Sequence, residues 1–321
     1  MGKKQFIQLW RLTACAMVFL VHFGQRIYFV GPLLTISDFG AKGVSLFFII
    51  SGFLLVNSYE KKADLKTFIY GRLLKILPLY YVVIAYYFVV HTFLLQNVPE
   101  DPTGFGWIRY LFCLNGILPD ADMYFWDNLG ITWTIPYFVF AYLMFPIVLK
   151  YVNSYGKSIL LLLGTLLLSA NMHWFGEWMK ILAKMPAFAL GVVLYFCVKE
   201  KREMCTSIFL CLLILYQLVF WRVTGMIYCY IFALMIIATE NISFTNPKIL
   251  KILEWSDNYS YTLYLCHGIV FIHILDRVEI GRVPEAVIAV VGSTVLTIAV
   301  NRWVEVPLRN KILQWSAPQQ N

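Results

Sequence analysis

The stretch RLTACAMVFLVH, from Arg11 to His22, carries a permanent cation at one end and an imidazole at the other, inside an otherwise apolar run. If this run is helical, eleven residues at about 100° each return to within roughly 20° of the starting direction. The two side chains then lie on one stripe of the helix, about 16 Å apart along its axis. Ionisable groups are costly in a segment that favours lipid, so we expect this pair to serve a function.

The rest of the chain repeats this apolar character. Of its 321 residues, 60% are hydrophobic and 14% are charged, whereas ordinary globular proteins carry about 25% charge. Apolar runs long enough to span a bilayer recur from end to end without the alternation of barrel strands. The sequence therefore predicts an all-α polytopic membrane protein with about ten transmembrane helices, forming a single membrane-embedded domain over residues 1–321. We expect the spans near 6–28, 40–58, 76–96, 131–150, 157–173, 180–198, 204–221, 225–240, 258–276 and 284–303.

The net charge of +8 is a topological signal. The basic residues gather in short loops between alternate spans, as the positive-inside rule requires, and this distribution argues against a nucleic-acid partner. It places both termini in the cytoplasm and makes the lipid bilayer the protein's surroundings. The seven cysteines form no C-x-x-C pair, so the sequence indicates neither a disulfide framework nor a metal site.

His22 and Arg11 suit different chemical tasks. A histidine shielded from water stays largely neutral, so His22 can take a proton from a hydroxyl or act as a nucleophile. Arg11 stays charged and can donate to a phosphate, a carboxylate or backbone carbonyls. The structural alternative is that Arg11 extends to the inner interface while His22 hydrogen-bonds a neighbouring helix.

Two further motifs lie in the first third of the chain. Gly43 and Gly52 in GVSLFFIISGF favour close approach of another helix, with Ser51 able to hydrogen-bond across that contact. Arg72 and Lys75 are three residues apart and share a helix face at the inner mouth of a span, where they could hold a polyanion such as the phosphates of a coenzyme. Ordinary positive-inside anchoring explains that basic pair equally well.

The second half of the chain supplies three more candidates. Trp133 precedes Pro136, which we expect to bend its span beside a cavity. Tyr264 and His267 share a helix face, giving a second imidazole within the membrane with a phenol beside it. Glu305 lies near the inner interface, where we expect a local ion pair with Arg302 or Arg309.

The outer ends of the spans are rich in aromatic and histidine residues. Aromatic side chains of the outer segment 97–130 could stack on sugar rings, although aromatic belts occur at every membrane interface. We expect three further histidines to be interfacial side chains rather than ligands: His91, His173 and His273.

Taken in chain order, these motifs resemble the membrane-bound acyltransferase family 3, whose members are integral-membrane enzymes that modify bacterial glycans. The resemblance rests on the Arg11–His22 spacing, GVSLFFIISGF, the Arg72–Lys75 pair before Pro78 and Tyr80, Trp133 followed by Tyr142 and Pro146, Tyr261-x-x-Tyr264-x-x-His267, and Glu305-x-Pro307.

The resemblance implies a ten-helix acyltransferase in a bacterial inner (plasma) membrane. It would move an acyl group, usually acetyl, from cytoplasmic acetyl-CoA to a sugar hydroxyl of a glycan or lipid-linked sugar across the membrane, with no metal. His22 would be the catalytic histidine and Arg11 its partner, with Arg72 and Lys75 at the donor's phosphates. Substrate contact or structural support would fall to Ser51, Trp133, Tyr264, His267 and Glu305.

The chain departs from the family pattern at three positions. Ser45 and Phe138 stand where family members often carry Asp and Glu, and Lys75 replaces an arginine and so loses its bidentate fork. His22 therefore lacks both familiar carboxylates. The sequence leaves open whether the acceptor attacks the thioester directly or an acyl-histidine forms first. It also leaves open a rival function, the transport or flipping of a polysaccharide intermediate.

Overall fold

The computed structural model describes residues 5–61, 64–96, 106, 108–115, 117, 131–171, 177–220 and 225–316. All regular structure among them is helical. Within these ranges, seven helical segments are long and apolar enough to cross a membrane, and two more apolar helices are shorter. This confirms the all-α polytopic prediction. The count of ten spans and the side of the membrane on which the termini lie stay predictions. Most of the outer segment 97–130, including its predicted aromatic belt, and His173 lie outside the described residues.

The chain divides into two compact units, which are described separately. The first unit comprises residues 1–17, 41–69 and 137–257. It holds the first parts of α1 (Gln5–Arg26), α4 (Leu65–Val89) and α11 (Pro247–Ile269), most of α6 (Ile135–Leu149), and all of α3 (Gly43–Tyr59), α7 (Tyr155–Ala170), the 3₁₀ segment Glu177–Lys184, α8 (Met185–Glu200), α9 (Glu203–Phe220) and α10 (Met226–Ala238).

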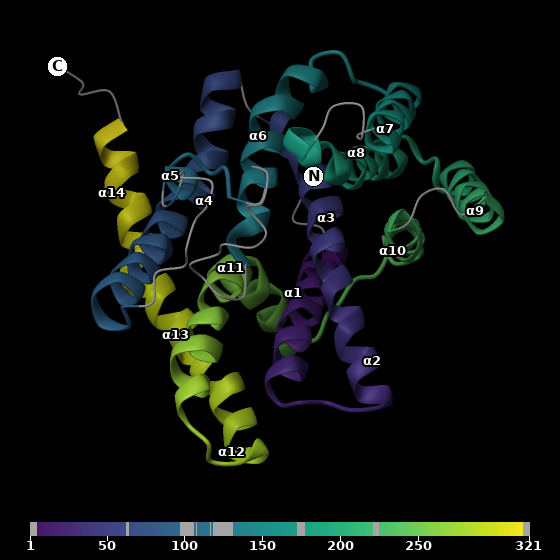
Figure 1. Cartoon of the computed structure of the whole chain (residues 1–321). Coiled ribbons are helices and arrows are strands. Elements are labelled where there is room, and N and C mark those ends of the chain that lie inside the picture. The colour runs from purple at the N-terminus through teal and green to yellow at the C-terminus, as the bar shows by residue number, and fades with distance from the viewer. Residues whose placement is uncertain are drawn as a thin grey trace. The chain divides into compact units, whose positions relative to one another are not determined.

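The second unit comprises residues 18–40, 70–136 and 258–321. Besides the remaining parts of α1, α4 and α11, it contains α2 (Pro32–Phe39), α5 (Ile108–Leu111), the 3₁₀ segment Ile131–Thr134, α12 (Arg282–Val287), α13 (Ser293–Val300) and α14 (Val306–Ser316). π-Helical turns at Val90–Leu94, Val270–Ile274, Ile288–Gly292 and Asn301–Glu305 interrupt or extend its helices. Figure 1 shows the α-helices with their labels.

Close packing of α3 against α8 forms the centre of the first unit. A Cβ built on Gly52 would lie 2.0 Å from the Phe188 carbonyl oxygen, and one on Gly191 would lie 2.0 Å from that of Ile49. Only glycine permits backbones to approach this closely. The predicted packing role of Gly52 is therefore confirmed. Ser51 is half-buried, and within the described part of the chain no hydrogen bond joins it to α8.

Two stretches between the predicted spans, 59–75 and 241–257, are largely helical, so the helices there begin earlier than the expected spans. In 59–75, α4 begins at Leu65, because the Asp64 side chain accepts a hydrogen bond from the Thr67 amide at 2.8 Å and caps the helix. In 241–257, α11 begins at Pro247, and the Asn246 side chain accepts from the Lys248 amide at 2.9 Å. An asparagine cap followed by proline is a strong helix start that span-length reasoning overlooks.

Pro136 does not bend a span, contrary to the prediction. It is the second residue of α6, directly after the 3₁₀ segment Ile131–Thr134. Proline fits the first turn of a helix because the amide hydrogen that it lacks has no partner within the helix there. The proline inside α6 is Pro146.

Within the second unit, α4 and the end of α11 run side by side in the same direction. The Tyr261 hydroxyl on α11 donates to the Ile76 carbonyl on α4 at 2.5 Å. Further along, the Tyr86 hydroxyl on α4 lies 2.9 Å from Nδ1 of His273, which belongs to the π-helical turn Val270–Ile274 that continues α11. The end of α1 packs on the same π-helical turn, where Phe19 contacts Phe271 with ring centroids 5.5 Å apart. The predicted topology requires all three spans to run from the inner to the outer face.

Candidate functional site

The cation of the opening stretch has an acidic partner that the sequence analysis missed. In the first unit, Arg11 on α1 forms an ion pair with Asp257 on α11, and each side chain is 13% exposed. Gln8, one turn earlier on α1, donates to the other carboxylate oxygen of Asp257 at 2.8 Å. Arg11 therefore does not extend alone to the interface. Its ion pair fastens α1 to α11 within this unit, and its partnership with His22 stays a prediction.

Two imidazoles lie side by side in the second unit. The rings of His22 on α1 and His267 on α11 have centroids 5.2 Å apart and are inclined by 36°. His267 is 1% exposed, whereas His22 is half-buried. Both residues are candidates from the sequence, but their meeting could not be predicted from it. The long-range packing of α1 on α11 brings them together.

The tautomer of His267 follows from its hydrogen bond. Its Nδ1 lies 3.0 Å from the carbonyl oxygen of Leu263, one turn earlier on α11. Because a carbonyl oxygen only accepts, Nδ1 carries the proton, and Nε2 of the neutral ring holds a lone pair. Among the described residues, neither Nε2 of His267 nor Nδ1 of His22 has a hydrogen-bond partner, although both atoms are buried.

Aromatic side chains enclose His267. The rings of Phe19, Phe271 and Tyr264 have their centroids 6.2, 5.9 and 6.2 Å from that of His267. The predicted proximity of Tyr264 and His267 is confirmed. The Tyr264 hydroxyl donates to the Ile131 carbonyl at 2.8 Å and lies 2.9 Å from the Thr134 hydroxyl.

The turn that binds Tyr264 also contains Trp133, which is half-buried. Residues 131–134 form a 3₁₀ segment, and both of the Tyr264 contacts just described are to residues of this segment. Trp133 therefore lies in the 3₁₀ segment that contacts Tyr264 and not in a bent span.

Glu305 is buried and does not behave as the predicted interfacial ion-pair partner. Its carboxylate accepts a hydrogen bond from the Thr262 hydroxyl and one from the Asn301 amide at 2.8 Å. The side chain of Asn301 also donates to the Thr262 hydroxyl at 3.2 Å. The π-helical turn Asn301–Glu305 holds both residues on this network. Glu305 thus ties the last span to α11 at Thr262, five residues before His267, which is a supporting role.

The predicted donor residues lie on α4 of the second unit. Arg72 is half-buried and Lys75 exposed, three residues apart on one helix. The next residue, Ile76, is the one bonded to Tyr261 of α11. His267 lies six residues beyond Tyr261, which is about 9 Å along a helix. The basic pair therefore flanks the stretch of α11 that leads to the imidazoles.

A second histidine cluster was not predicted. His91, expected at the interface, is 1% exposed, and its ring centroid lies 5.5 Å from that of His273. Both histidines belong to π-helical turns, at Val90–Leu94 and Val270–Ile274. Tyr87 contacts both rings. Such turns re-aim side chains and are not visible in an apolar pattern. Within the described ranges no group of three or more His, Cys, Asp and Glu could hold a metal.

The two departures from the family's acidic positions lie in the first unit. Phe138 packs in an aromatic cluster, with centroids 5.1 Å from Phe48 and 5.6 Å from Phe188. A glutamate there would lose this packing and enter an apolar environment. Ser45 is near enough to Cys229 for a hydrogen bond. Neither position supplies a carboxylate.

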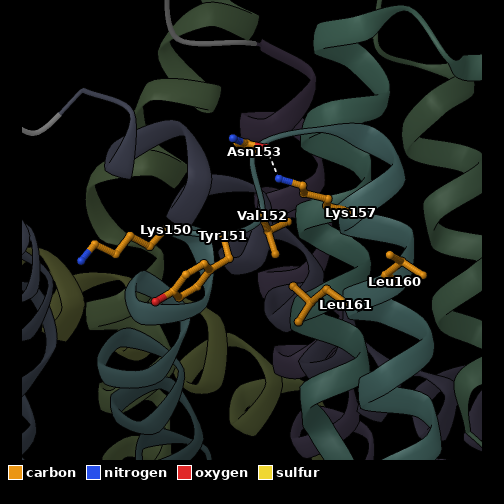
Figure 2. Close-up of a pocket in the computed structure, with 7 residues that line it drawn as sticks. All are labelled: Lys150, Tyr151, Val152, Asn153, Lys157, Leu160 and Leu161. Carbon is orange, nitrogen blue, oxygen red and sulfur yellow. Dashed lines mark hydrogen bonds between the residues drawn. The ribbon is translucent and has the colours of Figure 1, made fainter.

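An open pocket of about 560 Å³ lies where α6 ends and α7 begins, in the first unit. Figure 2 shows its lining, in which the Lys157 ammonium points to Asn153 and donates to its side chain at 3.0 Å. The remaining lining residues are Lys150, Tyr151, Val152, Leu160 and Leu161. The lining includes none of the predicted site residues, so we place the candidate site at the imidazole pair.

These features define an all-helical membrane protein in which the half-buried imidazole of His22, on a candidate membrane span, lies beside the buried imidazole of His267 on α11. Residues 4–302 match a family described as an acyltransferase domain, acyltransferase family 3. Because this match covers most of the chain, the chain belongs to that family.

The chain is similar to Nodulation protein 10 of Rhizobium leguminosarum bv. viciae. The two are 29% identical over 170 residues, which cover 46% of this chain and 45% of the relative. The matched region therefore spans less than half of that curated protein. No solved structure matches the chain.

Proposed function

We propose that this protein is a membrane O-acyltransferase that moves an acetyl group from cytoplasmic acetyl-CoA to a sugar hydroxyl of a cell-envelope glycan or lipid-linked sugar. The observation that carries the proposal is the pair of adjacent imidazoles, of half-buried His22 and buried His267, in a chain that belongs to an acyltransferase family. A bacterial inner membrane is the proposed location, because it separates acetyl-CoA from such glycans.

In the proposed reaction His22 is the general base. It takes the proton of the acceptor hydroxyl while the hydroxyl oxygen attacks the thioester carbonyl. The new C–O bond forms, the C–S bond breaks, and the proton passes from His22 to the leaving thiolate. The products are an acetylated sugar and free coenzyme A, so no proton is gained or lost. His22 is half-buried, which leaves one side of its ring open to an acceptor.

The donor is proposed to enter from the side of Arg72 and Lys75. The charge of these residues fits the phosphates of coenzyme A, and Arg72 can form two parallel hydrogen bonds to one phosphate. Their position beside Ile76, whose carbonyl accepts from Tyr261 of α11, supports a path for the flexible arm of the donor along α11 towards His267. Arg11 is proposed to support His22 indirectly, by holding α1 on α11 through Asp257.

The test is label transfer from donor to glycan. Purified full-length protein in nanodiscs is incubated with acetyl-labelled coenzyme A and envelope glycans or lipid-linked sugars. We expect label in an ester that mild alkali releases from the sugar. Movement of an unmodified sugar across a vesicle membrane, with no labelled product from any acceptor fraction, would instead favour the transporter function.

A further inference from the structure

The imidazole pair contains two buried nitrogen atoms without hydrogen bonds to the described residues, which is energetically costly. Nδ1 of His22 and Nε2 of His267 each lack a hydrogen-bond partner within the described ranges. Leaving a polar atom buried and unsatisfied costs about 1–3 kcal/mol. The two atoms belong to rings whose centroids are 5.2 Å apart, so a rotation of the His22 ring that turns Nδ1 towards Nε2 of His267 would let one atom satisfy the other.

The direction of that hydrogen bond is fixed from the α11 side. Because Nδ1 of His267 donates to Leu263, its Nε2 can only accept while the ring is neutral. The proton between the two rings must then belong to Nδ1 of His22. A neutral His22 protonated at Nδ1 carries its lone pair on Nε2. The chain of donors and acceptors therefore starts at a backbone carbonyl and ends at a defined nitrogen of His22.

The exposure of His22 agrees with this assignment. Its side chain is half-buried, while its Nδ1 is buried and has no hydrogen-bond partner among the described residues. The exposed part of the ring therefore lies away from Nδ1. Nε2, which would hold the lone pair, is then the nitrogen that an acceptor hydroxyl can reach.

We propose that His267 is the positioning residue for His22: it accepts the Nδ1 proton of His22 and so holds the Nε2 lone pair towards the acceptor hydroxyl. This inference rests on the proposed function. It gives His267 the task that a carboxylate performs for a catalytic histidine in the serine hydrolases, a task for which Ser45 and Phe138 supply no carboxylate. Hydrogen bonds of this kind often tighten only when substrate is bound.

Two amide substitutions separate this role from a structural one. In His267→Gln the amide oxygen can occupy the place of Nε2, whereas in His267→Asn the amide takes the place of Nδ1 and can keep the Leu263 bond. We expect His267→Asn and His267→Phe to lower kcat about 100-fold, with KM for acetyl-CoA unchanged, on the scale of general-base catalysis. We expect His267→Gln to stay within about 10-fold of wild type. Equal or better activity of His267→Asn than His267→Gln, or a wild-type rate in His267→Phe, would overturn the proposal.

A measurement on the unmodified chain covers the case in which these variants fail to fold. Solid-state NMR of ¹⁵N-histidine-labelled protein at neutral pH resolves the tautomer of each of the five histidines. We expect His22 and His267 both to be neutral and protonated at Nδ1; a proton on Nε2 of His22 would contradict the proposal. The spectrum is recorded without turnover, so it tests the tautomers independently of the reaction. An absence of acetyl transfer would contradict the proposed function but would not change the result for the tautomers.

Discussion

The Arg11–Asp257 ion pair gives the sharpest prediction about stability. Each side chain is 13% exposed, and Gln8 binds the second carboxylate oxygen of Asp257. Removing one partner of a buried pair costs about 3–5 kcal/mol, because the other charge stays buried. Asp257→Leu leaves the Arg11 charge unpaired and also removes the acceptor of the Gln8 amide. Because the Arg11 side chain keeps some contact with solvent, we expect the lower end of that range, a loss of about 3 kcal/mol in the free energy of unfolding.

The assay is a double-mutant cycle. Unfolding of Arg11→Leu, Asp257→Leu and the double variant is followed by tryptophan fluorescence in mixed detergent micelles. We expect the double variant to be more stable than the sum of the single effects predicts, because neither charge remains buried. The matched control is Glu60→Gln, which breaks an exposed ion pair with Lys199 worth at most about 1 kcal/mol. Additive single effects, or an Asp257→Leu variant as stable as the control, would refute the reasoning.

The remaining predictions concern packing, pH and the donor. Gly191→Ala should lose about 1–3 kcal/mol of stability, because its Cβ would collide with a carbonyl of α3. Gly164→Ala is the control and should lose none, since the space around its Cβ is open. Equal melting temperatures of the two variants would contradict this prediction. Burial alone would raise the pKa of Glu60, but hydrogen bonds from Lys199 and a tyrosine, together with the charge of Lys199, hold that pKa below its usual value. The small contribution of this pair should therefore be present above about pH 4.5 and fade as the pH falls further, and a pH titration of Glu60→Gln showing the same acid loss as wild type would exclude it. Arg72→Ala should weaken coenzyme A binding at least 10-fold by isothermal titration, since one bidentate phosphate contact is lost, and unchanged binding would remove the phosphate role.

Local patterns of the sequence predicted the helical class and several contacts. The apolar runs indicated membrane helices, and α1 is unbroken from Gln5 to Arg26, as the spacing of Arg11 and His22 requires. The glycine motif predicted the close contact at Gly52. The i, i+3 spacing predicted that Tyr264 and His267 would be neighbours. Each of these features depends on residues close together in the chain.

Contacts between distant segments could not be read in the same way. Asp257 is 246 residues from Arg11 in the sequence. It precedes the predicted span 258–276, because α11 begins at Pro247, well before the apolar run. For Glu305 the sequence predicts an ion pair with a neighbouring arginine, whereas its place in the π-helical turn lets its carboxylate accept a hydrogen bond from Thr262. The meeting of His22 and His267 likewise depends on how α1 packs on α11. Periodicity and hydropathy carry no information on such pairings.

The central claim is that His22 carries out acyl transfer. The most direct test measures labelled acetyl transfer to glycan by wild type and His22→Ala, each in nanodiscs, at matched protein amounts and with coenzyme A binding confirmed for both. We expect His22→Ala to lose transfer by at least about 100-fold, because a general base is absent, while it still inserts, folds and binds the donor. Substantial residual acetylation by the well-folded His22→Ala protein would contradict the account.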